Sequence, residues 1–252
     1  MKKLEIINSV YAIIALSLIS RIYAYYYFSD VEIVNEWGII LHNLNISGIL
    51  GYNVVLDQFN ALPKFAEVGE TVIPSAYMPP LYIYFINFIK FMSGGSIDFV
   101  KYIIFFQIFL SLISIYIFFK TVRNFEDHKK SIIFTLIFAF LPINIFAAVK
   151  ISSITLQLFL LVFYFYFLPQ HNNNKSIKRL IFFSIISGLL ILIRGEFLFF
   201  YLITIFYFFI YLSKNFKFFL ITIILTLLVT SPYIVRNYQN FNTYVLTKSF
   251  GY

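Results

Sequence analysis

Carboxylates that could do chemistry gather in one stretch of this sequence. Seven of the eleven acidic residues lie within residues 29–98, and Asp30, Glu32 and Glu36 come first among them. Asp30 and Glu32 stand just before a predicted helix, where the helix dipole favours negative charge. They are therefore either caps of that helix or candidates for a general base, which takes a proton from a reacting hydroxyl group.

Cationic side chains are expected close to these acids. Arg21 stands about 22 Å along an apolar helix that begins at Ile6, given a rise of about 1.5 Å per residue. An intramembrane charge is costly and points to function, although Arg21 could also snorkel to lipid phosphates. The planar fork of arginine matches phosphate oxygens. The candidates for holding an anionic phosphate are Arg21, Lys64, Lys90, Arg194 and Arg236.

The composition places these residues in a membrane protein. Of the 252 residues, 61% are hydrophobic and 12% are charged, against about 25% charged in soluble domains. The absence of cysteine excludes disulfides, iron–sulfur clusters and a thiol nucleophile. The net charge of +8 is better explained by cytoplasmic loops than by nucleic acid, which we do not expect as a partner.

Apolar segments predict an all-α integral membrane protein with about seven transmembrane helices. The first segment follows two lysines and lacks a small-residue cleavage site, so it is an uncleaved anchor. Residues 81–92 are too short to span, and their placement flat on the outer surface puts the basic loops inside. This gives a multi-pass protein of a bacterial inner or plasma membrane, with an inner N-terminus. The predicted spans are 6–28, 102–119, 131–149, 151–168, 180–194, 197–213 and 218–233.

The outer loop over residues 29–98 is the longest connection, and long loops are often functional. Residues 33–44 have the periodicity of an amphipathic interfacial helix, with Trp37 at headgroup depth and Asn43 on the polar side. A second interfacial helix is expected at residues 81–92, after the pair Pro79-Pro80. The whole chain then forms one membrane domain with its candidate site on the outer face.

The order of several short motifs resembles the GT-C membrane glycosyltransferases. The motifs are Asp30-Val31-Glu32, Glu36-Trp37-Gly38, Pro79-Pro80-Leu81-Tyr82 and Pro232-Tyr233-Ile234-Val235-Arg236-Asn237-Tyr238. The resemblance is to the branch of protein O-mannosyltransferases, lipid A aminoarabinose transferases and rhizobial lipopolysaccharide transferases. Each motif is weak alone, and the match depends on their order along nearly the whole chain.

The resemblance implies transfer of a sugar from a polyprenyl-phosphate donor to a hydroxyl of a lipid, glycan or protein acceptor. The modified Asp-x-Asp motif of the family falls on Asp30 and Glu32, and Glu36 competes with Asp30 for the role of base. A divalent metal on Asp30 and Glu32 is compatible with this chemistry but is not required. The motif residues Pro79, Pro80, Tyr82 and Asn237 are expected to be structural. Relatives continue beyond Tyr252, so we expect the chain to resemble an N-terminal half, with residues 234–252 an outer tail.

Two other functions remain open at this stage. A transporter or lipid-flippase component would need polar groups near mid-membrane and broken helices in repeated halves. The polar residues Gln107, Asn144 and Gln157 look scattered and unpaired in the sequence. A scaffold subunit without chemistry is the third hypothesis, against which the acid-rich outer loop argues.

Overall fold

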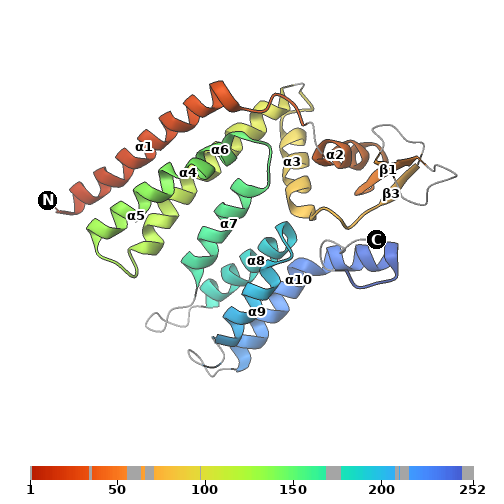
Figure 1. Ribbon diagram of the computed structural model, residues 1–252. Coiled ribbons are helices and arrows are strands. Elements are labelled where there is room, and N and C mark those ends of the chain that lie inside the picture. Colours follow the sequence, from red (N-terminus) through yellow and green to blue (C-terminus); the bar gives the residue numbers. More distant parts are fainter. Residues whose placement is uncertain are drawn as a thin grey trace.

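The computed structural model is largely helical, as the sequence predicts (Figure 1). It describes residues 2–33, 36–55, 64–65, 71–96, 98–168, 177–207, 210 and 216–245. The helices are α1 (Lys2–Phe28), α2 (Glu36–Ser47), α3 (Pro80–Met92), α4 (Phe99–Val122), α5 (His128–Phe140), α6 (Pro142–Val149), α7 (Ile154–Phe167), α8 (Ile177–Ile193), α9 (Phe197–Tyr207) and α10 (Phe216–Phe241). The strands are β1 (Gly51–Val55), β2 (Lys64–Phe65) and β3 (Thr71–Pro74).

Among the described residues, three helical segments are long and apolar enough to cross a membrane: Ser9–Phe28, Phe99–Val122 and Phe219–Phe241. The pair α5 and α6 adds a fourth if it is counted as one broken span. The helices α7 and α9 are apolar but shorter, with 14 and 11 residues. By length and composition the structure therefore supports three or four spans, and the predicted seven go beyond this.

The predicted span over residues 131–149 is bent by 48° between α5 and α6. Leu141 lies at the bend with an extended ψ of 123° and precedes Pro142, the first residue of α6. A residue before proline is disfavoured in the helical region, whereas proline itself is well suited to start a helix. The sequence Leu141-Pro142 thus explains the break.

The helices that follow form a tightly packed group. A Cβ atom added to Gly188 of α8 would lie 2.7 Å from Cβ of Val229 on α10, so only glycine permits this approach. Thr226 Oγ1 donates to the Ser184 carbonyl across the same interface, at 3.2 Å. The turn from α8 to α9 is closed by Phe197 N donating to Arg194 O, at 3.1 Å.

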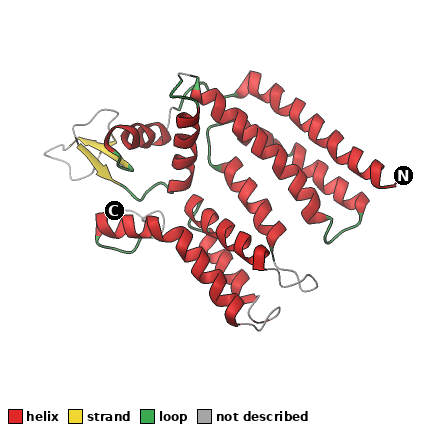
Figure 2. Cartoon of the chain, turned by 180° about the vertical axis from the view of Figure 1, so that it is seen from behind, coloured by secondary structure: helices red, strands yellow, loops and turns green. Residues whose placement is uncertain are grey.

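A small antiparallel sheet, with strand order β2-β1-β3, stands beside α2 and was not predicted (Figure 2). Asn43 of α2 is buried and its Nδ2 donates to the Gly51 carbonyl of β1, at 2.9 Å. Trp37 is buried with its ring centroid 5.0 Å from that of Tyr82, instead of facing lipid headgroups. The predicted apolar side of this helix is thus buried at Trp37, Ile40 and Leu41, whereas Asn43, predicted on the polar side, is covered by β1.

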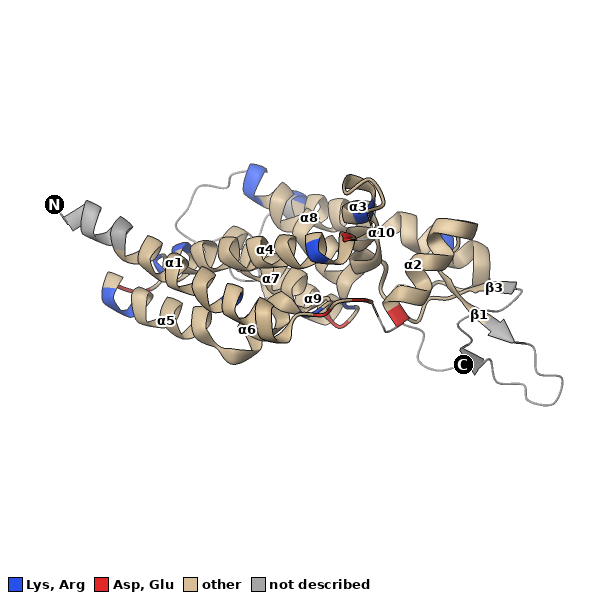
Figure 3. Cartoon of the chain, turned by 90° about the horizontal axis from the view of Figure 1, so that it is seen from above, with Lys and Arg blue, Asp and Glu red and all other residues tan. Residues whose placement is uncertain are grey.

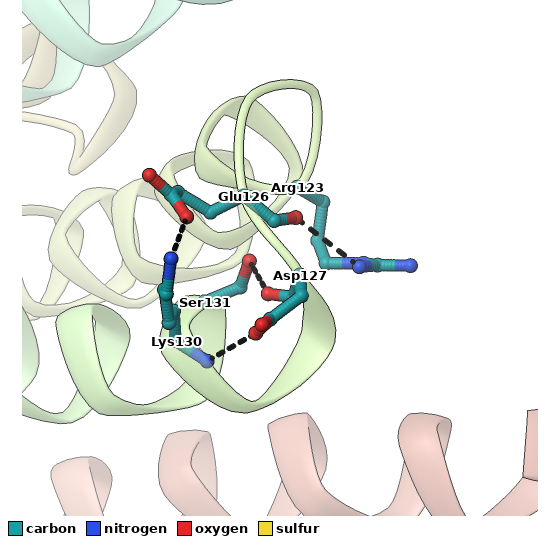
Figure 4. A network of polar contacts seen from close by, with 5 residues as sticks. All are labelled: Arg123, Glu126, Asp127, Lys130 and Ser131. Atoms are coloured by element: carbon teal, nitrogen blue, oxygen red, sulfur yellow. Dashed lines mark hydrogen bonds and ion pairs between the residues drawn. The ribbon is translucent and has the colours of Figure 1, made fainter.

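Charged residues concentrate at turns and helix ends, and the helix bodies are mostly neutral (Figure 3). The turn between α4 and α5 holds acidic and basic side chains in one network of polar contacts (Figure 4). There Asp127 Oδ1 accepts from Lys130 N and caps α5, while Lys130 Nζ donates to Glu126 Oε2, at 2.9 Å. The basic residues of this turn are Lys120, Arg123, Lys129 and Lys130.

Candidate functional site

Asp30 lies just beyond the C-terminal end of α1, where it contacts the connection between α6 and α7. Its Oδ1 accepts a hydrogen bond from Lys150 Nζ and its Oδ2 accepts one from Ile151 N, both at 2.8 Å. Its own N–H donates to Val149 O, at 3.4 Å. The side chains of Asp30 and Lys150 remain 30% and 39% exposed, so this ion pair is positioned by the fold and open to a ligand.

Behind the ion pair, a buried hydrogen-bond chain joins α3 and α4 to the same connection. Gln107 Nε2 donates to the Lys150 carbonyl, and Gln107 Oε1 accepts from Tyr82 OH, both at 2.7 Å. Burial, with a smaller contribution from the negative charge of Asp30, raises the pKa of Tyr82. The phenol is therefore a proton donor that holds Gln107, and Gln107 in turn fixes the backbone of Lys150.

This arrangement contains two residues that the sequence reasoning did not assign to the site. Lys150 is not among the cations that the sequence singles out, and Gln107 looks unpaired in the sequence. The signal for Lys150 was its place between two predicted spans, on the same side as Asp30. Gln107 gave no such signal, because a single amide in an apolar helix shows its partners only once the fold is known.

The other two candidate carboxylates take no part in the hydrogen bonds that join Asp30 to Lys150 and Ile151. Glu32 is exposed, and Glu36 is the first residue of α2. Burial, followed by the charges of Glu36 and Tyr77, raises the pKa of Tyr52 on β1. The charge of Glu36 is therefore felt at Tyr52, within α2 and the sheet. Of the three carboxylates, Asp30 is the one that bonds to the connection between α6 and α7.

The acids of the described residues do not form a site suited to a divalent metal. They contain no group of three or more His, Asp or Glu side chains that could hold one. Both Asp30 oxygens already accept N–H donors, and the cation beside them is the Lys150 ammonium. We therefore derive no chemistry through a metal here.

Arg21 lies inside the helix packing and is only 1% exposed. Its Nε donates to Ser111 Oγ of α4 at 2.8 Å, its Nη1 to Ser17 O at 3.1 Å, and its Nη2 to Ala139 O at 3.3 Å. Ala139 is in the last turn of α5, where carbonyls lack partners within the helix. Arg21 thus holds the broken end of α5 and does not face the surface where a phosphate would bind.

Arg236 joins α10 to the sheet region. Its Nη1 donates to Ser75 O at 2.9 Å and its Nη2 to Leu50 O at 2.5 Å. The neighbouring Asn237 is fully buried and donates through Nδ2 to Val245 O, at 2.8 Å. In this arrangement the predicted phosphate ligand and the predicted structural residue both bind backbone carbonyls.

The remaining candidates are spread over several elements. Lys90, at the end of α3, lies 5.6 Å from the centroid of the Phe99 ring, and Arg194 is exposed on the α8–α9 turn. Lys64 belongs to β2, but its side chain lies outside the described residues. Pro79 precedes α3 in an extended conformation and Pro80 is its first residue, which agrees with the predicted helix start.

Comparison of the chain with models of protein families, with curated proteins and with solved structures gave no match.

Proposed function

We propose that this chain is a membrane glycosyltransferase, which moves a sugar from a polyprenyl-phosphate donor to an acceptor hydroxyl. The acceptor belongs to a lipid, a glycan or a protein. One observation carries the proposal: an acid and a cation, Asp30 and Lys150, are held together, partly exposed, where the ends of apolar helices meet. A transfer from a phosphate-linked sugar needs one group for a proton and one for a phosphate.

In this mechanism Asp30 is the general base. One carboxylate oxygen takes the acceptor's hydroxyl proton as the acceptor oxygen forms a bond to the anomeric carbon. The bond between that carbon and the phosphate oxygen breaks, and its electron pair leaves with the phosphate. The Lys150 ammonium, 2.8 Å from Asp30 Oδ1, moves to the departing phosphate and frees the oxygen that accepts the proton. Attack from the side opposite the phosphate inverts the anomeric centre.

The proposed orientation has the Asp30 end on the outer face of a bacterial plasma membrane and seven spans in total. The distribution of charge supports it, because the α4–α5 turn at the other end of α4 carries several basic residues and such turns favour the cytoplasm. Since the chain has no cysteine, single-cysteine labelling is clean. Ser47→Cys and Ser75→Cys should react with an impermeant maleimide outside intact cells, and Asn124→Cys should not. Labelling of Asn124→Cys from outside would refute this orientation.

The catalytic role is tested by removing the charge of Asp30 and keeping its shape. In the proposed mechanism, Asp30→Asn lowers turnover about 10²–10⁴-fold, the range for a positioned acid–base group. Donor binding is retained, because Lys150 and the groups around it remain. Transfer of a radiolabelled sugar from purified polyprenyl-phosphate donor, in vesicles containing the full chain, measures turnover.

Two matched variants make this test specific. Glu36→Gln on α2 and Glu32→Gln at the exposed position remove a neighbouring negative charge and should each change turnover less than Asp30→Asn does. Loss of turnover in Glu36→Gln with full turnover in Asp30→Asn would assign the base to Glu36. Full turnover in all three variants would exclude Asp30, Glu32 and Glu36 as the base.

A second candidate function, a transporter or lipid-flippase component, is favoured by one observation. Arg21 is buried within a candidate span and bonds the end of the broken span formed by α5 and α6, and broken helices near buried charges are features of transport sites. The two functions separate in one assay. Movement of a labelled polyprenyl-phosphate sugar across vesicles that is lost in Arg21→Met and kept in Asp30→Asn would favour transport.

A further inference from the structure

An apolar groove of about 600 Å³ runs between α1 and the broken pair α5–α6. Its α1 wall is a stripe with helical spacing from Leu16 to Phe28, which spans about 18 Å at about 1.5 Å per residue. The opposite wall begins at the end of α5 and continues past the bend into α6. The lining residues are Leu16, Ile19, Ser20, Tyr23, Ala24 and Phe28 on α1, and Phe140, Pro142, Ile145 and Phe146 opposite.

One end of this groove lies next to the Asp30–Lys150 pair. The rings of Phe28 and Phe146, from the two walls, approach to 5.1 Å between centroids. Two residues after Phe28, Asp30 N donates to Val149 O. Both walls therefore end close to the ion pair along the chain, since Phe28 stands two residues before Asp30 and Phe146 four residues before Lys150.

We infer that this groove holds the hydrocarbon chain of the polyprenyl-phosphate donor, with its phosphate at Lys150. The inference rests on the proposed function and names the place of the donor within it. An apolar groove between two helices suits a hydrocarbon chain such as a polyprenyl tail, and the Lys150 ammonium, which follows α6 directly, complements a phosphate. Both walls belong to candidate membrane spans, so the chain can enter from the lipid without passing through water.

The groove can be filled without disturbing the core. Ile19 lines it and is 64% exposed, so Ile19→Trp adds bulk in the groove and leaves the helix packing in place. Ile22, on the same helix and 43% exposed, does not line it, and Ile22→Trp is the matched control. Lys150→Gln removes the cation.

Native mass spectrometry of the full chain measures binding of undecaprenyl phosphate, undecaprenol and phosphatidylglycerol. Undecaprenyl phosphate should bind at least about tenfold more tightly than phosphatidylglycerol, a difference of about 1.4 kcal/mol. Ile19→Trp should weaken its binding by a similar factor, and Ile22→Trp should leave it unchanged. Lys150→Gln should weaken the binding of undecaprenyl phosphate but not of undecaprenol.

Equal affinity for phosphatidylglycerol and undecaprenyl phosphate would overturn the inference, because the groove would then be ordinary lipid-facing surface. Insensitivity to Ile19→Trp would also overturn it, as would a second copy of the chain covering the groove in cross-linked dimers. A different result would refute the proposed function: the donor would bind as expected, but the wild-type chain would transfer no sugar. Transfer that survives Ile19→Trp unchanged would reject the groove and leave the function standing.

Discussion

Arg21 and Asp30 lie nine residues apart at the same end of α1, yet their surroundings differ in every respect. Arg21 is 1% exposed and bonds to a serine hydroxyl and to backbone carbonyls. Asp30 is 30% exposed and bonds to an ammonium group and to a backbone N–H. The first charge is enclosed by neutral groups, and the second meets an opposite charge at the surface.

This difference separates two uses of a charged side chain near a membrane. A charge that is buried among carbonyls can satisfy backbone groups freed by a helix break, which is a structural use. A charge that remains partly exposed beside its partner can exchange that partner for a ligand. The predictions below test whether stability and activity divide between the two regions in this way.

The largest effect on stability should come from Arg21. Arg21→Met keeps much of the side-chain length but leaves Ser111 Oγ and Ala139 O without their donor. Each orphaned buried group costs about 1–3 kcal/mol, so we expect the two together to lower the free energy of unfolding by about 2–6 kcal/mol. Denaturation by dodecyl sulfate in mixed micelles, followed by far-ultraviolet circular dichroism, measures it.

Asp30→Asn is the control for this measurement and should cost less than about 1 kcal/mol, as for a partly exposed ion pair. If Arg21→Met is as stable as the wild type, the free energy lost by burying the guanidinium charge equals the free energy gained from its hydrogen bonds. The structural explanation would then fail, and Arg21 would have to be kept for a function inside the membrane.

The helical architecture could be read from the sequence because its signals are local. Long apolar segments predicted α1, α4 and most of α10, and Pro79-Pro80 predicted the start of α3. The break in the span over residues 131–149 was missed, although Pro142 stands inside it. Hydropathy averages over a window, whereas a helix break depends on one dihedral angle at Leu141.

The site could be predicted only in part, because its contacts join distant positions. Asp30 was identified from its place after the first span, but its partner Lys150 is 120 residues away. The sheet beside α2 was missed as well, since β1 and β3 are short and only their β-branched residues mark them. Sequence pattern therefore located the elements, and the pairings between them required the fold.

Tyr82 should give a smaller loss than Arg21, because it supports the ion pair from behind. Tyr82→Phe removes the hydroxyl that donates to Gln107 Oε1 at 2.7 Å and leaves that buried acceptor unsatisfied. We expect a loss of about 1–3 kcal/mol in the free energy of unfolding.

The control is Tyr84→Phe on the same helix, at an exposed position, which should change the free energy of unfolding by less than about 0.5 kcal/mol. Equal losses in both variants would mean that the Gln107 chain does not stabilise this region. Fluorescence of Trp37, the single tryptophan, follows this region directly because its ring contacts Tyr82.

The smallest effect on stability among the charged contacts should come from Lys150. Lys150→Gln breaks the partly exposed pair with Asp30, and Lys130→Gln breaks the exposed pair with Glu126, which joins residues four apart. Both pairs have similar N–O distances, and each loss should stay below about 1 kcal/mol.

The two substitutions should differ in their effects on sugar transfer, because only Lys150 stands where the donor phosphate is proposed to leave. Denaturation and transfer are measured on the same preparations, with Lys130→Gln expected to keep wild-type turnover. If Lys150→Gln alone lowered the free energy of unfolding by several kcal/mol, the pair would instead be a structural contact that holds α1 against α7. Asp30 would then belong with Arg21, and the distinction between an enclosed structural charge and an available chemical one would no longer hold.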